Sequence, residues 1–268
     1  MLFLLAAGLT LVFGIMDLIN LAHGSLYMIG AYLAATLTQA TGSFGLALPL
    51  AVAATGVLGM LLELAVLRHL YRRDHLSQVL ATFALILIAN ETTRTIWGVQ
   101  SLSLNVPQAL SGSVELLPGV NYPAFRLLII AVGIAVAALL YLVVVHTRVG
   151  MWVRAGASNR EMATAMGTNI NVLFTVVFGA GAALCALAGA MLGPLLAVQV
   201  GMGESILILA FVVVVIGGIG SIRGAFVGAL LVGMTDTLGR AFIPLGLKGL
   251  LSTSFADAAG PAIASISI

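Results

Sequence analysis

Long apolar runs separated by short polar stretches dominate the chain. The first runs from Leu2 to Gln39 and is long enough for two passes joined by a break. The later runs are Leu46–Leu67, Val79–Trp97, Leu127–Val145, Val172–Val198, Ile206–Ile216, Ala225–Thr235 and Phe255–Ile268. A helix needs about 20 apolar residues to cross a bilayer. The pattern therefore predicts an all-α polytopic membrane helix bundle of about eight to nine spans, with broken or re-entrant elements.

The polar stretch 146–171 interrupts this pattern most clearly. Ser158 and Glu161 have the S-x-x-E spacing of a capping box, in which each side chain satisfies a free backbone N–H at a helix start. Gly167 is the first later residue that adopts a left-handed conformation without steric cost. We therefore expect a short helix that begins near Asn159 and stops at Gly167.

One face of that short helix is apolar. Met162, Ala165 and Met166 are spaced i, i+3 and i+4 and share a face, while Arg160 and Glu161 point elsewhere. Methionines on an exposed face favour an adaptable docking surface. The alternative is that this face folds back onto the ends of the membrane helices.

A second polar interruption lies within the first apolar run. It spans Asp17–Ser25 and includes Asn20, His23 and Gly24, with Tyr27 one turn further on. Non-helical backbone at membrane depth survives where protein or a water-filled cavity satisfies it, and transporters place binding sites there. The break is a candidate substrate-pathway or gating element. The alternative is an ordinary polar turn between two helices.

Glycines concentrate near the end of the chain. Gly220, Gly224 and Gly228 form a GxxxGxxxG series that permits close helix packing, and Gly217 and Gly218 precede it. A dinucleotide fingerprint is rejected because it requires glycine where this chain has Arg223. We expect close packing with a local break at Gly217, Gly218 and Gly220, a second candidate pathway element.

Composition supports a membrane protein. Charged residues are 7% and hydrophobic residues 61% of the 268, against about a quarter charged in soluble domains. The net charge of +2 indicates no nucleic-acid surface. The single cysteine, Cys185, excludes an internal disulfide, and no ligand spacing indicates a metal. The whole chain, 1–268, is interpreted as one transmembrane domain, and we expect one or both ends to be cut relative to the natural gene product.

The basic residues predict the orientation. If successive loops lie on alternate sides of the membrane, seven basic residues fall on one side and four on the other. The four are Arg94, Arg126, Arg240 and Lys248. The richer side is cytoplasmic by the positive-inside rule. It includes the loop 146–171 and its short helix.

Two other classes receive little support. An enzyme is disfavoured because the sequence contains no G-x-x-x-x-G-K-[ST] phosphate loop and no plausible Ser–His pair on adjacent helices. A stand-alone secondary transporter needs a carboxylate deep in the membrane. The candidates Asp17, Glu63 and Asp236 all lie near predicted span ends or breaks.

Three stretches resemble one known family. The chain from Gly8 through Asn20, His23 and Gly24 to Tyr32 resembles the opening of branched-chain amino acid ABC importer permeases of the H type. The run 211–228 is similar to that family's late glycine motif, and Glu161-Met-Ala163-Thr-Ala-Met-Gly167 resembles the E-A-A-x-x-x-G signature of binding-protein-dependent importers. Met162 departs from the alanine usual in that signature.

The resemblance implies a transport subunit of the bacterial inner (plasma) membrane, with no cofactor and no enzymatic activity of its own. Its partners would be a second homologous permease, two cytoplasmic ATPases and a periplasmic substrate-binding protein. The loop 146–171 would be the coupling loop, with ATPase contacts from Ser158, Arg160, Glu161, Met162, Ala163, Met166 and Gly167. The expected cargo is Leu, Ile or Val, moved by alternating access. The alternative cargoes are urea, amides or aromatic acids.

Overall fold

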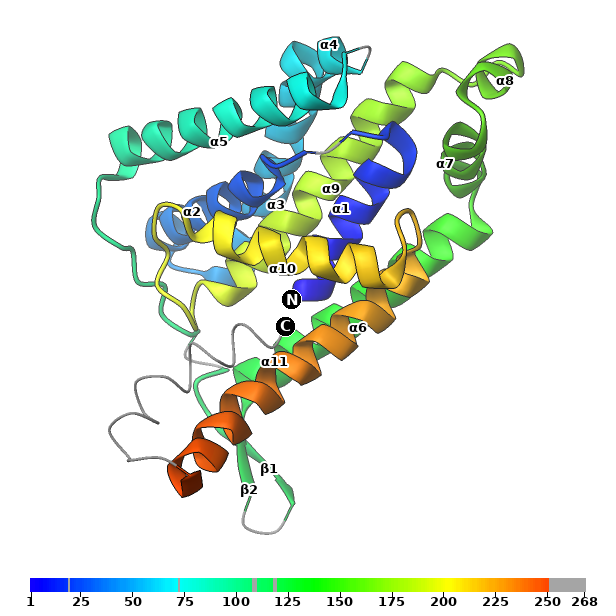
Figure 1. Ribbon diagram of the computed structural model, residues 1–268. Coiled ribbons are helices and arrows are strands. Elements are labelled where there is room, and N and C mark those ends of the chain that lie inside the picture. Colours follow the sequence, from blue (N-terminus) through cyan, green and yellow to red (C-terminus); the bar gives the residue numbers. More distant parts are fainter. Residues whose placement is uncertain (19, 72, 108–109, 118–119, 251–268) are drawn as a thin grey trace.

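The computed structural model describes residues 1–18, 20–71, 73–107, 110–117 and 120–250. In chain order the elements are α1 (Leu2–Met16), α2 (His23–Thr41), α3 (Phe44–Leu62), the π-helix η1 (Glu63–Leu67), α4 (Arg68–Leu70), α5 (His75–Trp97), β1 (Ser113–Leu117), β2 (Val120–Pro123), α6 (Ala124–His146), α7 (Arg148–Ser158), α8 (Arg160–Ala165), α9 (Ile170–Leu192), α10 (Met202–Gly217) and α11 (Ile222–Leu250). Figure 1 shows their arrangement.

The predicted all-α membrane bundle is confirmed. Within the described residues, five helical segments are long and apolar enough to cross a membrane: Phe44–Leu70, α5, α6, α9 and the first part of α11. The shorter apolar helices α1 and α10, together with the mostly buried α2, correspond to the other predicted elements. The ninth predicted span, Phe255–Ile268, lies outside the described residues.

Helix α9 is the centre of the bundle, and small residues let its neighbours approach it. A Cβ added at Gly59 of α3 would lie 2.5 Å from the Cβ of Ala182 in α9. Gly30 of α2 meets the backbone of Ala186 equally closely. Cys185 lies buried between these two crossings. Packing of small residues drives helix association in a membrane, where the hydrophobic effect between helices is weak.

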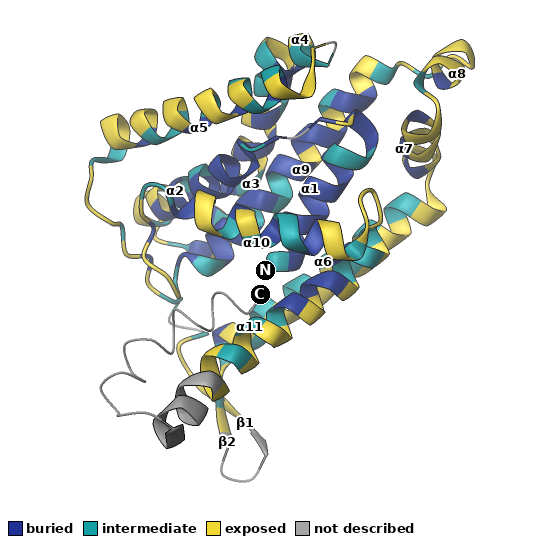
Figure 2. Cartoon of the chain, viewed as in Figure 1, coloured by how far each residue is buried: buried dark blue, intermediate teal, exposed yellow. Residues whose placement is uncertain are grey.

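The outer helices expose apolar side chains. Helix α6 is apolar all round, and much of its surface is exposed, as is that of α5 (Figure 2). An apolar helix with unburied sides is stable when lipid surrounds it. The core therefore consists of α1, α2, α3, α9 and α10, with α5, α6 and α11 at its outside.

The two ends of the bundle differ. Helices α4, α7 and α8 lie at one end, and the hairpin β1–β2 with the start of α6 lies at the other (Figure 1). The basic residues Arg68 of α4, Arg148 and Arg154 of α7 and Arg160 of α8 lie at the first of these ends, and all four belong to the richer side used to predict the cytoplasm. The hairpin was not predicted, because its strands are short and lie within a loop rich in Pro, Gly and Ser.

Candidate functional site

The short predicted helix exists as α8, but its N-cap is one residue later than expected. Ser158 is the last residue of α7, and Asn159 has the extended backbone conformation of a cap. The Asn159 Oδ1 atom accepts a hydrogen bond from the Met162 N–H at 2.9 Å. The predicted Ser158–Glu161 capping box is therefore wrong. The Asn side chain takes this role because the chain turns at Asn159 and Ser158 remains helical.

The C-terminal end of α8 agrees with the prediction. Gly167 has φ of 87°, the left-handed conformation that favours glycine. The Gly167 N–H donates to the Thr164 carbonyl at 2.9 Å and the Thr168 N–H to the Ala163 carbonyl at 3.0 Å. This is the Schellman arrangement, which satisfies carbonyl groups left free at a helix end. Both ends of α8 are thus fixed by local bonds.

The apolar face of α8 is exposed. Met162 is 60% and Met166 81% exposed, and Ala165 is exposed beside them. Ala163 lies on the opposite side and is buried against the bundle. The face does not fold back onto the membrane helices in this structure. An apolar surface turned away from the protein at an aqueous end is typical of a docking site.

Helix α7 was not predicted. Thr147 caps it through a bond from the Gly150 N–H to its hydroxyl oxygen, 3.3 Å long. Gly150, Val153 and Gly156 are buried at i, i+3 and i+6, while Trp152 is exposed. The sequence signals for α7 were the capping residue Thr147 and the i, i+3, i+6 spacing. Arginines and glycines interrupt the apolar pattern, so the helix could not be recognised from hydrophobicity.

A groove of about 560 Å³ separates α7 from the beginning of α9. It is lined mainly by apolar side chains and opens beside α8. Its walls include Val149, Trp152, Met166, Val172 and Val176. The exposed face of α8 therefore continues into a concave apolar surface. Aromatic and methionine side chains of this kind are enriched in protein interfaces.

Arg160 anchors α8 on its inner side. Its Nη2 donates to the Ile15 carbonyl in the last turn of α1 at 3.2 Å. Its guanidinium carbon also lies 5.2 Å from the centre of the Phe174 ring of α9, within cation–π range. Arg160 thus links α8 to two helices of the core.

A polar cavity of about 520 Å³ joins the three regions that the sequence singled out. Asp17 contributes from the α1–α2 break and Ile219 from the glycine turn between α10 and α11. The α7–α8 junction contributes Ser158, Arg160 and Glu161. These segments are far apart in the sequence, so the sequence alone did not indicate that they lie around one cavity.

The α1–α2 break is real, and its polar side chains are enclosed. Asp17 has φ of 51°, and Asn20 Oδ1 accepts from the Ala22 N–H at 3.1 Å. Asn20 and His23 are fully buried. The His23 ring occupies space that glycines provide, since a Cβ at Gly8 would lie 2.9 Å from its Nε2. In this conformation Asn20 and His23 are packed by protein on all sides.

The remaining predicted pathway residues are distributed over the fold. Gly24 packs against the Gly203 carbonyl, where α2 crosses α10, and a Cβ there would clash with it. Tyr27 lines a separate cavity of about 370 Å³, together with Met202, Ser205 and Arg240. Gly24 and Tyr27 therefore do not line the polar cavity at the α7–α8 junction.

The glycine series forms a tight turn, as expected. Gly218 and Gly220 have φ of 86° and 80°. Gly217 and Gly224 pack backbone to backbone across the α10–α11 corner, and Gly220 packs against Gly14 of α1. Close approach without a Cβ explains why glycine occupies these positions.

Comparisons with known proteins identify the family. Residues 1–256 match the family model described as "Branched-chain amino acid transport system / permease component". The chain belongs to this family. It is thus a transport permease, as the resemblance implied, and both the family and the helices agree with the predicted inner-membrane location.

Several curated relatives of this permease are similar over most of their length. The high-affinity branched-chain amino acid transport system permease protein BraD of Pseudomonas aeruginosa is 32% identical over 250 residues, covering 88% of this chain and 81% of BraD. LivH of Salmonella typhimurium is 27% identical over 269 residues, with 93% and 85% covered. The probable LivH of Methanocaldococcus jannaschii is 27% identical over 249 residues, with 89% and 76% covered. No solved structure matches the chain.

Proposed function

We propose that this permease is the H-type subunit of an ATP-driven importer and that α8 is its coupling helix. The observation that carries the proposal is the exposed face of Met162, Ala165 and Met166 on a helix capped at both ends. Short-range bonds hold the helix together, so its outer face is free to receive a partner. Glu161 and Gly167 belong to the same segment and would shape that contact.

The partner on this face is a cytoplasmic ATPase. The segment lies on the end of the bundle with the basic stretches, which the positive-inside rule assigns to the cytoplasm. The groove beside α8 offers Trp152 as an aromatic contact and extends the methionine face. A complete importer would contain two ATPases, a second homologous permease and a periplasmic binding protein.

The cargo is a branched-chain amino acid: Leu, Ile or Val. The relatives BraD and LivH are named as branched-chain amino acid transport permeases, which supports this choice over urea, amides or aromatic acids. Selectivity would come mostly from the binding protein. Transport assays with radiolabelled leucine and urea in the same vesicles separate the alternatives.

Alternating access would follow from rigid-body movement of α8 and the helices it contacts. The polar cavity supports this mechanism, because the α7–α8 junction, the α1–α2 break and the glycine turn surround one space. Displacing α8 would therefore act directly on both breaks. Asn20, His23, Gly24 and Tyr27 at the first break, with Gly217, Gly218 and Gly220 at the second, are proposed as the gating and pathway elements.

The proposal is tested by placing a charge on the exposed face. Met166→Asp is expected to reduce the ATPase that co-purifies with the permease about ten-fold or more, because a buried carboxylate is costly at an apolar contact. ATP-dependent leucine uptake should fall with it. Val99→Asp is the matched control, since Val99 is 80% exposed in the loop after α5. Equal ATPase recovery from the two variants would contradict the assignment of α8.

A further inference from the structure

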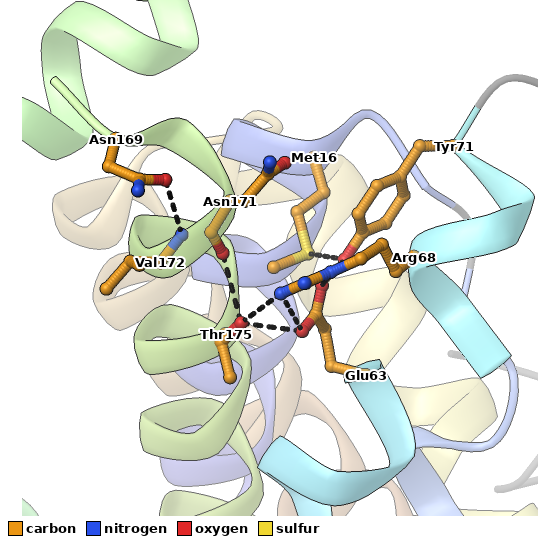
Figure 3. Close-up of polar contacts among 8 residues, drawn as sticks. All are labelled: Met16, Glu63, Arg68, Tyr71, Asn169, Asn171, Val172 and Thr175. Atoms are coloured by element: carbon orange, nitrogen blue, oxygen red, sulfur yellow. Dashed lines mark hydrogen bonds and ion pairs between the residues drawn. The ribbon is translucent and has the colours of Figure 1, made fainter. Parts of the chain in front are cut away.

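Glu63 is a fully buried carboxylate in the part of the bundle nearest α8. Its exposed fraction is 0%. Glu63 Oε2 lies 3.3 Å from Arg68 Nη2 and accepts from the Thr175 hydroxyl at 2.7 Å, while Oε1 accepts from the Tyr71 hydroxyl at 2.9 Å (Figure 3). A buried charge is costly unless it is paired and hydrogen-bonded. We call Glu63, Arg68, Tyr71 and Thr175 the Glu63 cluster.

The local helix geometry is adapted to this cluster. Glu63–Leu67 is a π-helix, in which the backbone bonds join residues five apart. Glu63 and Arg68 are five residues apart, and the wider turn brings them to the same side. In an α-helix they would point in different directions. Short π-helical segments are frequent at functional sites.

The cluster connects α3 to the first turns of α9. Thr175 has one hydroxyl proton, which it shares between Glu63 and the Asn171 carbonyl at 3.0 Å. Its oxygen accepts from Arg68 Nη2 at 2.9 Å. The bonds therefore cross from one helix to the other in both directions, close to the point where α9 follows α8.

Aromatic contacts extend the cluster to α8. The Tyr71 ring packs edge-to-face against Phe174, with centroids 5.3 Å apart. The guanidinium of Arg160, the first residue of α8, lies over the same Phe174 ring. The Tyr71 hydroxyl also contacts Met16 Sδ at the end of α1. Burial and the Glu63 carboxylate both raise the pKa of Tyr71, so its hydroxyl remains a donor.

We infer that Glu63 is a positioning residue that transmits displacement of α8 to α3. Arg160, Phe174, Tyr71 and Glu63 form a continuous chain of contacts from the docking helix to that span. The inference rests on the proposed function of α8. Its consequence is that breaking the cluster uncouples ATP hydrolysis from transport without removing the ATPase contact.

The same geometry argues against an ion-coupling role for Glu63. Both carboxylate oxygens already accept from protein donors, and Arg68 supplies the balancing charge. A coupling carboxylate must instead exchange a proton or cation during transport. Uptake by Glu63→Gln that lost its dependence on ATP and followed an ion gradient would overturn the inference.

The test is the ratio of leucine transported to ATP hydrolysed, measured in the same vesicles containing the complete importer. Glu63→Gln is expected to lower this ratio about ten-fold, the scale of a typical coupling between sites, while hydrolysis stimulated by the binding protein persists. Glu91→Gln is the matched control, because Glu91 forms an ion pair with Arg94 that is exposed and lies near the C-terminal end of α5, outside the Glu63 cluster. Its ratio should remain that of the unmodified protein.

A second variant, Tyr71→Phe, tests the same inference if the Glu63→Gln protein does not fold. Tyr71→Phe retains the ring against Phe174 and removes only the hydroxyl bonded to Glu63. Its ratio should fall in the same direction, about two- to three-fold. Uptake and hydrolysis that decline in proportion, with an unchanged ratio, would overturn the inference alone. Uptake by the unmodified importer without ATP would overturn the proposed function and this inference with it.

Discussion

Two asparagines perform the same local task in opposite surroundings. Asn20 Oδ1 accepts from the Ala22 N–H in the α1–α2 break, and Asn159 Oδ1 accepts from the Met162 N–H at the start of α8. Asn20 is fully buried, whereas Asn159 is exposed. One polar break is thus enclosed by the bundle and the other faces the surroundings. A polar residue in an apolar sequence therefore indicates a break in the helix, but it does not show whether that break is buried or exposed.

The difference arises from what packs around each break. Glycines at positions 8, 24 and 181 let α1, α9 and α10 close over the first break. No atom lies within 4 Å of a Cβ added at Gly167, so the end of α8 is open. The α1–α2 break can open only if the surrounding helices move. The end of α8 can contact a partner without such a movement.

The largest expected effect comes from opening the enclosed break. Gly24→Val places side-chain atoms against the Gly203 carbonyl, so we expect a loss of about 3 kcal/mol in the free energy of unfolding, the upper end of the usual overpacking cost. Thermal unfolding of the detergent-solubilised protein measures it. Gly45→Val is the control, because a Cβ added there meets only the Ser43 hydroxyl oxygen, at the ordinary contact distance of 3.9 Å. A stable Gly24→Val protein would contradict the tight α2–α10 crossing.

A smaller effect is expected at the open break. Gly167→Val forces a β-branched residue into the left-handed region, at a cost of about 1–2 kcal/mol. Gly42→Val imposes the same strain at the end of α2, where φ is 67° and space is also open. Both variants should lose similar thermal stability, but only Gly167→Val should also lose ATP-dependent uptake. Equal uptake in the two would show that the end of α8 has no special role.

The smallest expected effect distinguishes the two candidate caps of α8. Asn159→Ala should destabilise the helix by about 1 kcal/mol, since it removes the bond to the Met162 N–H. Ser158→Ala should change little, because Ser158 ends α7. Hydrogen exchange at the first amides of α8 reports the difference. Faster exchange in Ser158→Ala than in Asn159→Ala would show that Ser158, and not Asn159, caps α8.

The apolar pattern predicted much of the fold. Eight predicted elements correspond to helices, because a run of apolar residues long enough for a membrane has few other stable conformations. Boundaries were less accurate. The apolar run predicted to end at Leu67 continues as a helix through η1 into α4, which includes Arg68. Local spacing was more informative for charged pairs: Glu91 and Arg94, three residues apart in the sequence, form an ion pair at 3.0 Å.

The geometry of the candidate site was predicted in part. The shared face of Met162 and Met166 and the helix end at Gly167 follow from local spacing and backbone conformation, which can be inferred from the sequence. The contact between Thr175 and Glu63 joins residues 112 apart, and no local pattern encodes it. The same holds for the cavity that Asp17, Glu161 and Ile219 share. Helix α7 was missed for a different reason, since its buried face consists largely of glycines.

Labelling a single cysteine tests the central claim, that the face of α8 is a cytoplasmic docking surface. Cys185 is fully buried and gives little background, so Met166→Cys reports on one site. We predict that a membrane-impermeant thiol reagent modifies this residue in inside-out vesicles, not in intact cells, and that the bound ATPase protects it. Modification from the outside of intact cells, or equal modification with and without the ATPase, would contradict the account.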